Sequence, residues 1–448
     1  MVLVDHHRCA YCGGCVSVCP VEALTLAETR LVVNDDCIDC GDCVAACPVG
    51  ALRPEPAQRA RGHFRRCYDL VVVGAGPGGS TAARVAAQAG LSVLLLEKRQ
   101  EIGAPVRCAE GVSHDQLVPF IEPDPCWIAA EVSQVQITTV TNGATHTVRA
   151  AGGHGYVLER RVFDRVLAER AVHAGAEVRV KTAATGLSME DGRVRGVRVR
   201  RGDYLAGGGE VEVEAQVVIG ADGVEAQVGR WAGLDVRLPL EDTMVCVQYL
   251  LAGIEIDPAC TCCVIGHEVA PGGYAWIFPK GEGKANVGLG VQADLWQDVA
   301  AGLAPDGAGR VGEGTVLGYL TRFIETYPFL AQGYPVTLVA GNVPVALPPA
   351  RMVTGGLMLV GDAARQVDPL IGGGIVNAMA AGELAAKVAV EAIAAGDTSA
   401  SFLSRYEDAW HRSVGRKMRR NYRLREKFSP TQRTDERFVR AFAMAVGG

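Results

Sequence analysis

The segment YDLVVVGAGPGGSTAARVAAQAGLSVLLLEKR, residues 68–99, constrains the fold of this chain more than any other stretch. Its apolar run 70–73 predicts a buried parallel strand, the alanine-rich stretch to Gln88 predicts a helix, and the run 93–96 predicts a second strand. A glycine-rich turn lets a pyrophosphate approach the helix N-terminus, and an acid after the second strand accepts hydrogen bonds from ribose hydroxyls. We therefore expect a dinucleotide-binding α/β domain, with cofactor contacts at Gly74, Gly76, Gly78, Gly79 and Glu97.

This fingerprint alone does not distinguish NAD from FAD, but two later segments do. VVIGADGVEAQVGR places Asp222 after a strand, and TGGLMLVGDAARQ places Gly361 and Asp362 after another. They resemble the second and third flavin motifs of the p-hydroxybenzoate hydroxylase-like FAD superfamily, in which the Gly-Asp acid contacts the ribityl or pyrophosphate region. Further on, Gly373, Gly374 and Ile375 begin a helix whose amides can face the N1/O2 edge of the flavin.

The first 52 residues contain two cysteine runs, CAYCGGCVSVCP and CIDCGDCVAACP. In this spacing three cysteines bind one [4Fe–4S] cluster, and the fourth cysteine of each run binds the other cluster. Zinc prefers sets built from two distant pairs, and nothing in the sequence suggests the secretion that disulfides would accompany. The segment resembles a bacterial-type two-cluster ferredoxin. The expected ligands are Cys9, Cys12, Cys15 and Cys47 for one cluster, and Cys37, Cys40, Cys43 and Cys19 for the other.

The charge and hydropathy of the sequence indicate which partners the protein can bind and in which cellular compartment it works. The net charge of −6 gives no support for nucleic-acid binding. Residues 405–440 hold twelve Lys/Arg against five Asp/Glu, a net +7. We see no basic segment followed by an apolar stretch, as a signal peptide requires, and no apolar run long enough to span a bilayer. Free thiols and clusters fit a reducing cytosol, so we expect a cytoplasmic protein.

Three further stretches resemble the geranylgeranyl reductases, FAD enzymes that saturate isoprenoid chains. GAPVRCAEGVS matches the family's cysteine loop beside the flavin, and ERRVFDRVLAERAVHAGAEV matches its R-x-x-F-D pattern, whose arginine contacts FAD. PGGYAWIFPKGEGKANVGLG matches the family's substrate-domain signature. The resemblance implies FAD contacts at Cys108, Ala109, Gly111 and Arg160, and substrate contacts at Tyr274, Trp276, Phe278 and Pro279.

The aromatic residues of that signature also have a physical reading. Tyr274, Trp276 and Phe278 alternate, so on a strand they share one face, which suits an apolar, elongated ligand or the packing of a core. An isolated alkene is not polarised, so its reduction needs a strongly reducing flavin and an acid. Cys108 is our candidate acid, with Tyr274 or a bound water as the next choice. The cluster of Cys260, Cys262, Cys263 and His267 is spaced too tightly for a common metal cage, so we expect packed thiols there.

The expected organisation is a ferredoxin domain at 1–52, a linker at 53–66, a FAD-binding domain at 67–240 and 346–395, an antiparallel substrate-binding domain at 241–345, and a helical region at 396–448. The expected partners are a prenyl lipid or prenylquinone substrate and a low-potential electron donor, either a ferredoxin or a reductase. The segment RYEDAWHRSVGRKMRRNYRLREKF predicts one long basic helix, whose charged face is either simply solvated or docked on an anionic membrane at the inner face.

Two other functions remain open at this point. One is a quinone oxidoreductase similar to the electron-transfer flavoprotein dehydrogenases, which would reduce a quinone ring in place of a prenyl tail. The other is a non-catalytic relay that only passes or senses electrons. The aromatic strand argues against a relay, because a relay needs no apolar tunnel. A flavin monooxygenase is disfavoured, since such enzymes usually take hydride from NAD(P)H.

Overall fold

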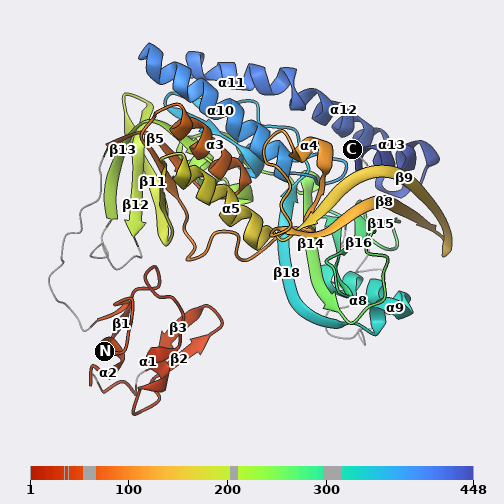
Figure 1. Cartoon of the computed structure of the whole chain (residues 1–448), viewed down its shortest axis with the longest axis horizontal. Coiled ribbons are helices and arrows are strands. Elements are labelled where there is room, and N and C mark those ends of the chain that lie inside the picture. Colours follow the sequence, from red (N-terminus) through yellow and green to blue (C-terminus); the bar gives the residue numbers. More distant parts are fainter. Residues whose placement is uncertain are drawn as a thin grey trace.

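The computed structural model describes residues 2–34, 36–38, 40–53, 67–201, 210–295 and 315–446. In Figure 1 a small N-terminal body lies below the first of two large sheets, and C-terminal helices run along the top of the molecule. This arrangement confirms the expected α/β fold with a second, largely antiparallel sheet and a helical C-terminus. The expected linker, 53–66, lies outside the described residues except for Arg53, which ends a strand.

The N-terminal body builds the same small unit from each cysteine run. Each run forms a four-residue helix, and two short antiparallel strand pairs close the body around the buried cysteines. The elements are β1 (Leu3–Val4) paired with β4 (Leu52–Arg53), β2 (Leu24–Ala27) paired with β3 (Arg30–Val33), α1 (Gly14–Ser17) and α2 (Asp42–Ala45).

The first large sheet has the order β10-β6-β5-β13-β12-β11, and its first four strands are parallel. The apolar runs of the dinucleotide segment form two adjacent central strands, because strands covered on both faces need continuous apolar sequence. Its strands are β5 (Cys67–Val73), β6 (Val93–Leu96), β10 (Glu177–Arg179), β11 (Thr182–Glu190), β12 (Arg193–Arg201) and β13 (Glu210–Gly220), with β20 (Leu357–Leu359) beside β13 and β19 (Val353–Thr354) beside β20.

Three helices cover one face of this sheet side by side (Figure 1). They are α3 (Pro77–Gln88), α5 (Arg160–His173) and α10 (Ile375–Ala395). Helices α3 and α10 touch backbone to backbone, because a Cβ at Gly382 would lie 2.1 Å from the Gly78 carbonyl oxygen. This close crossing places the N-terminal ends of both helices at the same edge of the sheet. Short helices follow the strand ends at η1 (Gly223–Glu225), α6 (Gln227–Trp231) and η3 (Gly361–Ala364).

The second large sheet has the order β18-β14-β17-β16-β15-β8-β9-β7, with one parallel pair, β15 and β8. Three of its strands, β7 to β9, come from residues 111–158, within the range expected for the first part of the FAD-binding domain. Its elements are β7 (Gly111–Ser113), α4 (His114–Leu117), β8 (Ile128–Thr141), β9 (Ala144–Leu158), η2 (Leu240–Asp242), β14 (Thr243–Ala252), β15 (Cys260–Ile265), β16 (Tyr274–Pro279), β17 (Lys284–Gln292), α8 (Val316–Thr326), α9 (Pro328–Ala331) and β18 (Tyr334–Pro344).

The C-terminal region corrects one expectation. The basic segment forms two helices, α11 (Ala400–Arg412) and α12 (Val414–Lys427), and not a single long one. The break falls at Ser413, whose backbone leaves the helical region and whose hydroxyl donates to the Ala409 carbonyl. Serine competes in this way with regular helix hydrogen bonding. The turn η4 (Pro430–Gln432) then leads to α13 (Glu436–Val446), which packs on the second sheet.

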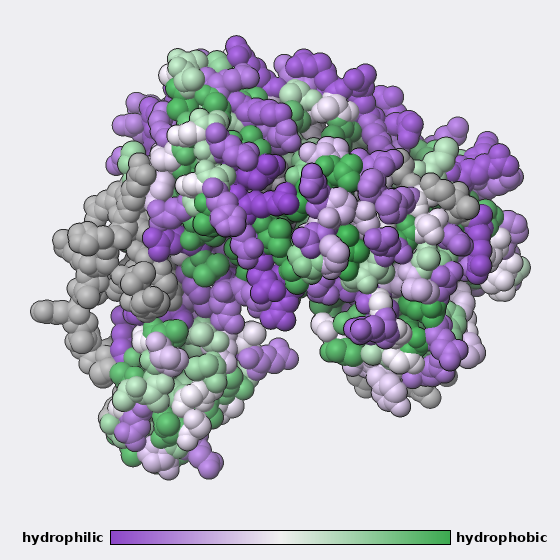
Figure 2. Space-filling view, viewed as in Figure 1, coloured by the Kyte–Doolittle hydropathy of each residue, from purple (hydrophilic) through white to green (hydrophobic). Residues whose placement is uncertain are grey.

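Figure 2 shows a hydrophilic surface over the C-terminal helices and a hollow between the N-terminal body and the lobe of the second sheet. The N-terminal body contacts the first sheet through two cations. Lys181 donates from Nζ to the Cys9 carbonyl oxygen at 2.5 Å, and Nη1 of Arg200 lies 3.1 Å from Nε2 of His7. Among the described residues, no helix combines the length and apolarity that crossing a bilayer takes.

Candidate active site

The expected dinucleotide turn has glycines where a ligand can approach the backbone closely, because no side chain stands in the way. Gly74 has a φ of 105°, and a Cβ there would lie 2.3 Å from the Ala221 carbonyl oxygen, so only glycine fits. A Cβ at Gly76 would meet no protein atom within 4 Å, so this glycine faces open space. Gly79 packs against the strand, because its Cβ would lie 1.9 Å from the Gly74 carbonyl oxygen. The turn therefore fits the three glycine roles of a pyrophosphate site.

Three acids stand at the carboxyl ends of neighbouring strands, around this turn. Glu97 follows β6, and its carboxylate accepts backbone hydrogen bonds from Ala75 at 3.2 Å and Arg99 at 2.9 Å. Asp222 follows β13, where burial raises its pKa and its Oδ1 atom is buried without a partner among the described residues. Asp362 follows β20, and burial raises its pKa as well. A buried unpartnered oxygen is costly, so this edge fits a polar ligand with hydroxyl donors, as FAD has.

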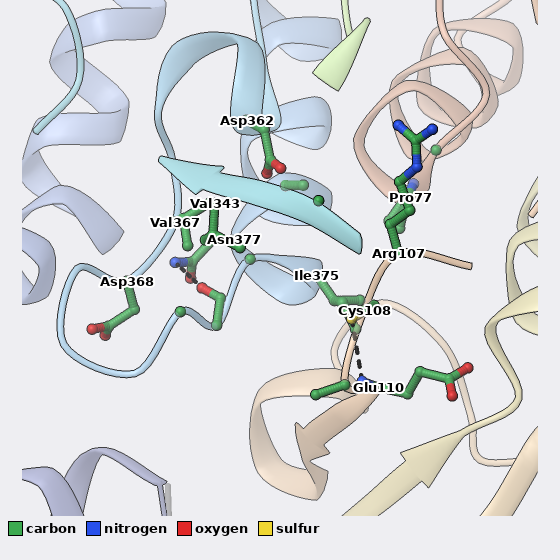
Figure 3. Close-up of a pocket in the computed structure, with 18 of the residues that line it drawn as sticks. Pro77, Arg107, Cys108, Glu110, Val343, Asp362, Val367, Asp368, Ile375 and Asn377 are labelled. Atoms are coloured by element: carbon green, nitrogen blue, oxygen red, sulfur yellow. Dashed lines mark hydrogen bonds between the residues drawn. The ribbon is translucent and has the colours of Figure 1, made fainter. Parts of the chain in front are cut away.

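The loop 368–374 and the start of α10 form the far wall of the site. Asp368 braces the loop, since its backbone N–H donates to Gly373 and its carboxylate accepts from Asn421 at 2.8 Å. Tyr274 donates its hydroxyl proton to the Ile371 carbonyl at 2.5 Å. Helix α10 begins at Ile375, so its free N–H groups and positive dipole end face this loop. In Figure 3, Asp362 and Asn377 lie on one side of the site, Ile375 lies beside Cys108, and the Asp368 carboxylate points away from Cys108.

The Cys108 loop reaches the same space from the other side. The Cys108 sulfur accepts a hydrogen bond from the Glu110 backbone N–H at 3.2 Å, drawn as a dashed line in Figure 3. Burial raises the pKa of the Cys108 thiol, so the group holds its proton at neutral pH. Arg160 begins α5 and forms a hydrogen-bonded ion pair with Asp164 at 2.7 Å, and its positive charge acts against the rise in the Cys108 pKa.

The aromatic strand β16 forms the third wall. Tyr274, Trp276 and Phe278 face the space beside the flavin motifs, and the Trp276 ring lies edge-on to Tyr274 with centroids 5.8 Å apart. Trp276 donates from Nε1 to Gln248 at 2.7 Å. Pro279 occupies the alternate face of the strand, paired with Ala285, and does not line the space.

These walls enclose one continuous cavity of about 950 Å³. Of the residues expected at the flavin or substrate, all line this cavity except Gly79 and Pro279. Helix α13 closes it from outside, where Phe442 is buried and its ring lies 5.0 Å, centroid to centroid, from Tyr274. A single volume therefore joins an extended cofactor cradle to an apolar chamber, as binding sites for large ligands often do.

Two groups of cysteines meet in the N-terminal body. Charge repulsion from the neighbouring thiols of Cys47 and Cys12 contributes to the pKa of Cys9, although burial is the larger cause of its rise. Backbone N–H groups donate to sulfur at equivalent places in the two runs, from Ala23 to Cys19 at 3.2 Å and from Ala51 to Cys47 at 3.1 Å. Such bonds tune iron–sulfur ligands. The second group lines a small hollow and consists of Cys19, Cys37, Cys40 and Cys43.

Within the described ranges, no three side chains of His, Cys, Asp or Glu converge on one point as a single ion requires. Each cysteine of a [4Fe–4S] cluster binds a different iron, so the sulfurs that hold a cluster need not converge on one ion. Among the described residues, no metal site forms at Cys260, Cys262 and Cys263. These thiols lie along β15 between packed strands, with Cys263 turned towards the cavity.

Sequence reasoning missed the polar residues that hold the Cys108 loop. Lys280 and Asn286 are buried and both donate to the buried Glu110 carboxylate, and Gln248 joins Trp276 to the Cys108 backbone. Glu110 stands in the motif CAEG and Lys280 in FPKGEG, and a charged residue inside each apolar motif could have indicated a buried ion pair. The sequence predicted a helical C-terminal region, but not that Phe438 and Phe442 of α13 line the cavity; they stand four residues apart, the spacing of one helix face.

Comparison with known proteins agrees with this geometry. A 4Fe-4S dicluster domain model matches residues 1–53, an NAD(P)-binding Rossmann-like domain model matches 72–119, and a FAD binding domain model matches 126–269. The geranylgeranyl reductase catalytic domain model matches 242–303 and so contains the aromatic strand. The fold and the site thus define a FAD-dependent oxidoreductase with an N-terminal iron–sulfur domain.

Similarity to individual proteins identifies the family within this class of oxidoreductases. The chain is 49% identical to the digeranylgeranylglycerophospholipid reductase of Methanosarcina acetivorans, over 78% of this chain and 81% of the relative, and 46% identical to that of Methanosphaerula palustris, over 81% and 86%. The crystal structure of a geranylgeranyl bacteriochlorophyll reductase-like protein from Thermoplasma acidophilum is 42% identical, covers 82% of this chain and 89% of its own, and superposes with a TM-score of 0.73. The chain belongs to the geranylgeranyl reductase family, oxidoreductases that act on CH–CH groups.

A more distant structure shares the fold alone. The myxobacterial chondrochloren halogenase CndH is 21% identical, with a TM-score of 0.63 over 86% of this chain and 90% of its own. The architecture is therefore common to FAD enzymes of several chemistries, and the reaction depends on the residues of the site.

Proposed function

We propose that the protein saturates the geranylgeranyl chains of a membrane lipid precursor, with electrons delivered to FAD through two [4Fe–4S] clusters of its own N-terminal domain. The observation that carries the proposal is the continuous cavity in which the flavin motifs, Cys108 and the aromatic strand β16 face one another. The relatives at 46–49% identity are named digeranylgeranylglycerophospholipid reductases, which supports a lipid bearing prenyl chains as the substrate.

Saturation of an isolated alkene needs one hydride and one proton for each double bond. FAD held by the flavin motifs would supply the hydride, and clusters held by the N-terminal cysteines would return electrons to the flavin one at a time. The residues of the chain supply the rest. Trp276, Phe278 and Phe442 are all at least nine-tenths buried and form the apolar chamber that excludes water and holds the prenyl chain along the strand.

The proton comes from a group that stays protonated until the substrate is in place. Cys108 fits this role, because its thiol is buried, holds its proton at neutral pH and lines the cavity between the flavin motifs and the chamber. Tyr274, the second candidate, already donates its hydroxyl proton to the Ile371 carbonyl. We therefore assign Tyr274 to bracing the loop and Cys108 to proton donation.

A stripe of cations supports a peripheral membrane site for the enzyme. Arg416, Arg420, Arg423 and Lys427 are exposed and recur every three or four residues along α12, so they lie on one face of that helix. The opposite face of α12 contributes Met418 to the cavity wall. An anionic membrane bound at the stripe would present its lipids close to the chamber.

The experiment is anaerobic incubation of the reduced enzyme with geranylgeranyl lipids and prenylquinones, followed by mass spectrometry. We expect a gain of two hydrogens per saturated bond in the lipid tails. Reduction of a quinone ring with no gain in the tail would establish a quinone oxidoreductase, and no oxidation of the flavin by any prenyl compound would establish an electron relay. Anaerobic protein should contain about eight iron and eight sulfide per chain, as two cubane clusters require, and stoichiometric zinc would contradict the cluster assignment.

A further inference from the structure

Three buried polar side chains of the second sheet donate hydrogen bonds to the short loop that carries Cys108. Gln248 of β14 donates to the Cys108 carbonyl at 3.1 Å, and Asn286 of β17 donates to the Ala109 carbonyl at 3.2 Å. Lys280, just after β16, donates to the Glu110 carboxylate at 2.8 Å. Buried polar groups are costly unless satisfied, so three of them converging on one loop indicate that its position matters.

Glu110 is the centre of this junction, with a side chain that is only 4% exposed. One carboxylate oxygen accepts from the backbone N–H of Arg160 at 2.8 Å, and the other accepts from Lys280 at 2.8 Å and Asn286 at 2.7 Å. The Lys280 side chain is 6% exposed and also reaches the Leu158 carbonyl. One carboxylate therefore joins the Cys108 loop to the end of β9, the start of α5 and the hairpin of β16 and β17.

The backbone of Glu110 acts on Cys108 directly. Glu110 has a φ of 74°, a left-handed conformation that a residue with a side chain adopts only when its surroundings hold it there. In that conformation its N–H points at the Cys108 sulfur. The carboxylate of the same residue accepts from the backbone N–H of Arg160, whose guanidinium pairs with Asp164. Glu110 thus supplies the donor at the thiol through its backbone and holds the start of α5 through its carboxylate.

We infer that Glu110, held by Lys280 and Asn286, is the positioning residue that aims the Cys108 thiol into the cavity. The inference rests on the proposed function for its rate measurement but not for its chemical labelling. A buried ion pair seldom adds net stability over apolar residues of the same volume. The pair is therefore retained here because the loop must keep one position, and not because the fold needs the charge.

The test compares Glu110→Gln, Lys280→Met and the double variant with a matched control. The control is Glu282→Gln with Lys284→Met, an ion pair on the same hairpin whose side chains are 89% and 37% exposed. The first measurement is the single-turnover rate of prenyl saturation in flavin-reduced enzyme, together with substrate affinity and FAD content. The second is the pH dependence of Cys108 alkylation in the oxidised protein, followed by peptide mass spectrometry.

We expect Glu110→Gln to slow saturation by about 100-fold, the scale of a small misplacement of a reacting group, with substrate affinity and FAD content unchanged. The alkylation midpoint should move to lower pH, since loss of the negative charge and entry of water both favour the thiolate. The double variant should regain the unfolding midpoint of the wild type but not its rate. The control should match the wild type in every measurement.

Recovery of both rate and alkylation profile in the double variant would overturn the inference, because the pair would then matter only for charge balance. An unchanged rate and profile in Glu110→Gln would overturn it as well. Where Glu110→Gln does not fold, Asn286→Leu removes one uncharged donor, and we expect a loss of about tenfold in the same rate. A wild-type enzyme that saturates no prenyl chain would refute the proposed function alone, and the alkylation profile would still decide the role of Glu110.

Discussion

At the scale of single residues, Cys108 is set apart from the other thiols by what surrounds it. Burial raises its pKa, while the Glu110 N–H donates to its sulfur and the positive charge of Arg160 opposes that rise. Cys246 and Cys263 also border the cavity, and burial raises the pKa of each to about 12. Of these three buried thiols, Cys108 combines a proton held by burial with a backbone donor and a nearby cation that can stabilise the thiolate left after the proton departs.

The pH dependence of the reaction should report this thiol. Because its pKa is raised above the ordinary 9.0, the rate of prenyl saturation should stay constant through neutral pH and fall only at higher alkalinity, where the thiol ionises. Cys108→Ser should slow saturation and remove the alkaline fall while substrate binding persists. Single-turnover oxidation of the reduced flavin measures both, with Cys126→Ser, an exposed thiol, as control. A full rate in Cys108→Ser would exclude the thiol as the acid.

Trp276 should contribute to prenyl binding in two separable ways. Trp276→Ala removes a buried aromatic face and should weaken prenyl binding by about 2–4 kcal/mol. Trp276→Phe keeps an aromatic ring but loses the hydrogen bond to Gln248, and should cost about 1 kcal/mol. Anaerobic titration of the flavin spectrum with a prenyl lipid measures both affinities. FAD content should stay at the wild-type level, since Trp276 belongs to no cofactor motif; equal affinities in all three proteins would place the prenyl chain elsewhere.

At the scale of elements, α12 has two faces with different roles. One face is buried and holds Arg425, whose side chain is 8% exposed and pairs with Asp242 at 2.9 Å, fastening the helix to the second sheet. The other face carries the cationic stripe of Arg416, Arg420, Arg423 and Lys427. A basic segment of sequence thus divides into a structural cation and solvent-facing cations, and only the second kind is available to a membrane.

Replacing all four stripe residues with glutamine should weaken binding to vesicles that contain anionic lipid by about 1 kcal/mol per charge at low salt. The effect should shrink as ionic strength rises, because the interaction is screened. Vesicle co-sedimentation measures it. A control that removes the same charge from other exposed sites, Arg30, Arg165, Arg193 and Arg195, should retain more binding. Equal losses in both proteins would mean that net charge and not the stripe governs the association.

At the scale of the whole molecule, the N-terminal body meets the first sheet on the side of the first cysteine run. Lys181 donates to the Cys9 carbonyl, lies 4.8 Å from the centroid of the Tyr11 ring and is followed directly by Thr182, which lines the cavity. The second run, with exposed Cys40 and the largely exposed Ile38, lies in a separate hollow. Under the proposed function, electrons would therefore pass from the second group of cysteines to the first and then to the flavin.

Lys181→Glu should slow flavin reduction by a low-potential donor protein, because it places a negative charge against the acidic N-terminal domain. Iron and sulfide content should be unchanged, and turnover with dithionite-reduced flavin should persist. Stopped-flow absorbance at the flavin band separates these steps.

Cys40→Ser should instead lower the iron content and slow the reduction of the flavin by the donor protein. Donor-driven reduction at the full rate after removal of residues 1–53 would show that the domain is not the electron input.

Much of the fold and part of the site could be predicted from the sequence, because the relevant patterns are local. The helix end at Gln88 and the strand Val93–Leu96 coincide with the structure, since alanine-rich sequence and apolar runs act over a few residues. The flavin motifs and the cysteine spacing are equally local. The single basic helix was wrong because one serine at position 413 ended it, which periodicity does not reveal.

The sequence by itself determined which chemistry the chain carries: a dinucleotide turn, flavin motifs, cluster-type cysteines and an aromatic strand. Only the tertiary structure decided how these parts meet. It placed strands β7 to β9 in the second sheet, closed the chamber with Phe442 of α13, and brought Lys280 to Glu110 across 170 residues. The reason is that the spacing of residues within a motif constrains only the backbone nearby. A buried carboxylate and its ammonium partner come into contact only when the whole core packs around them.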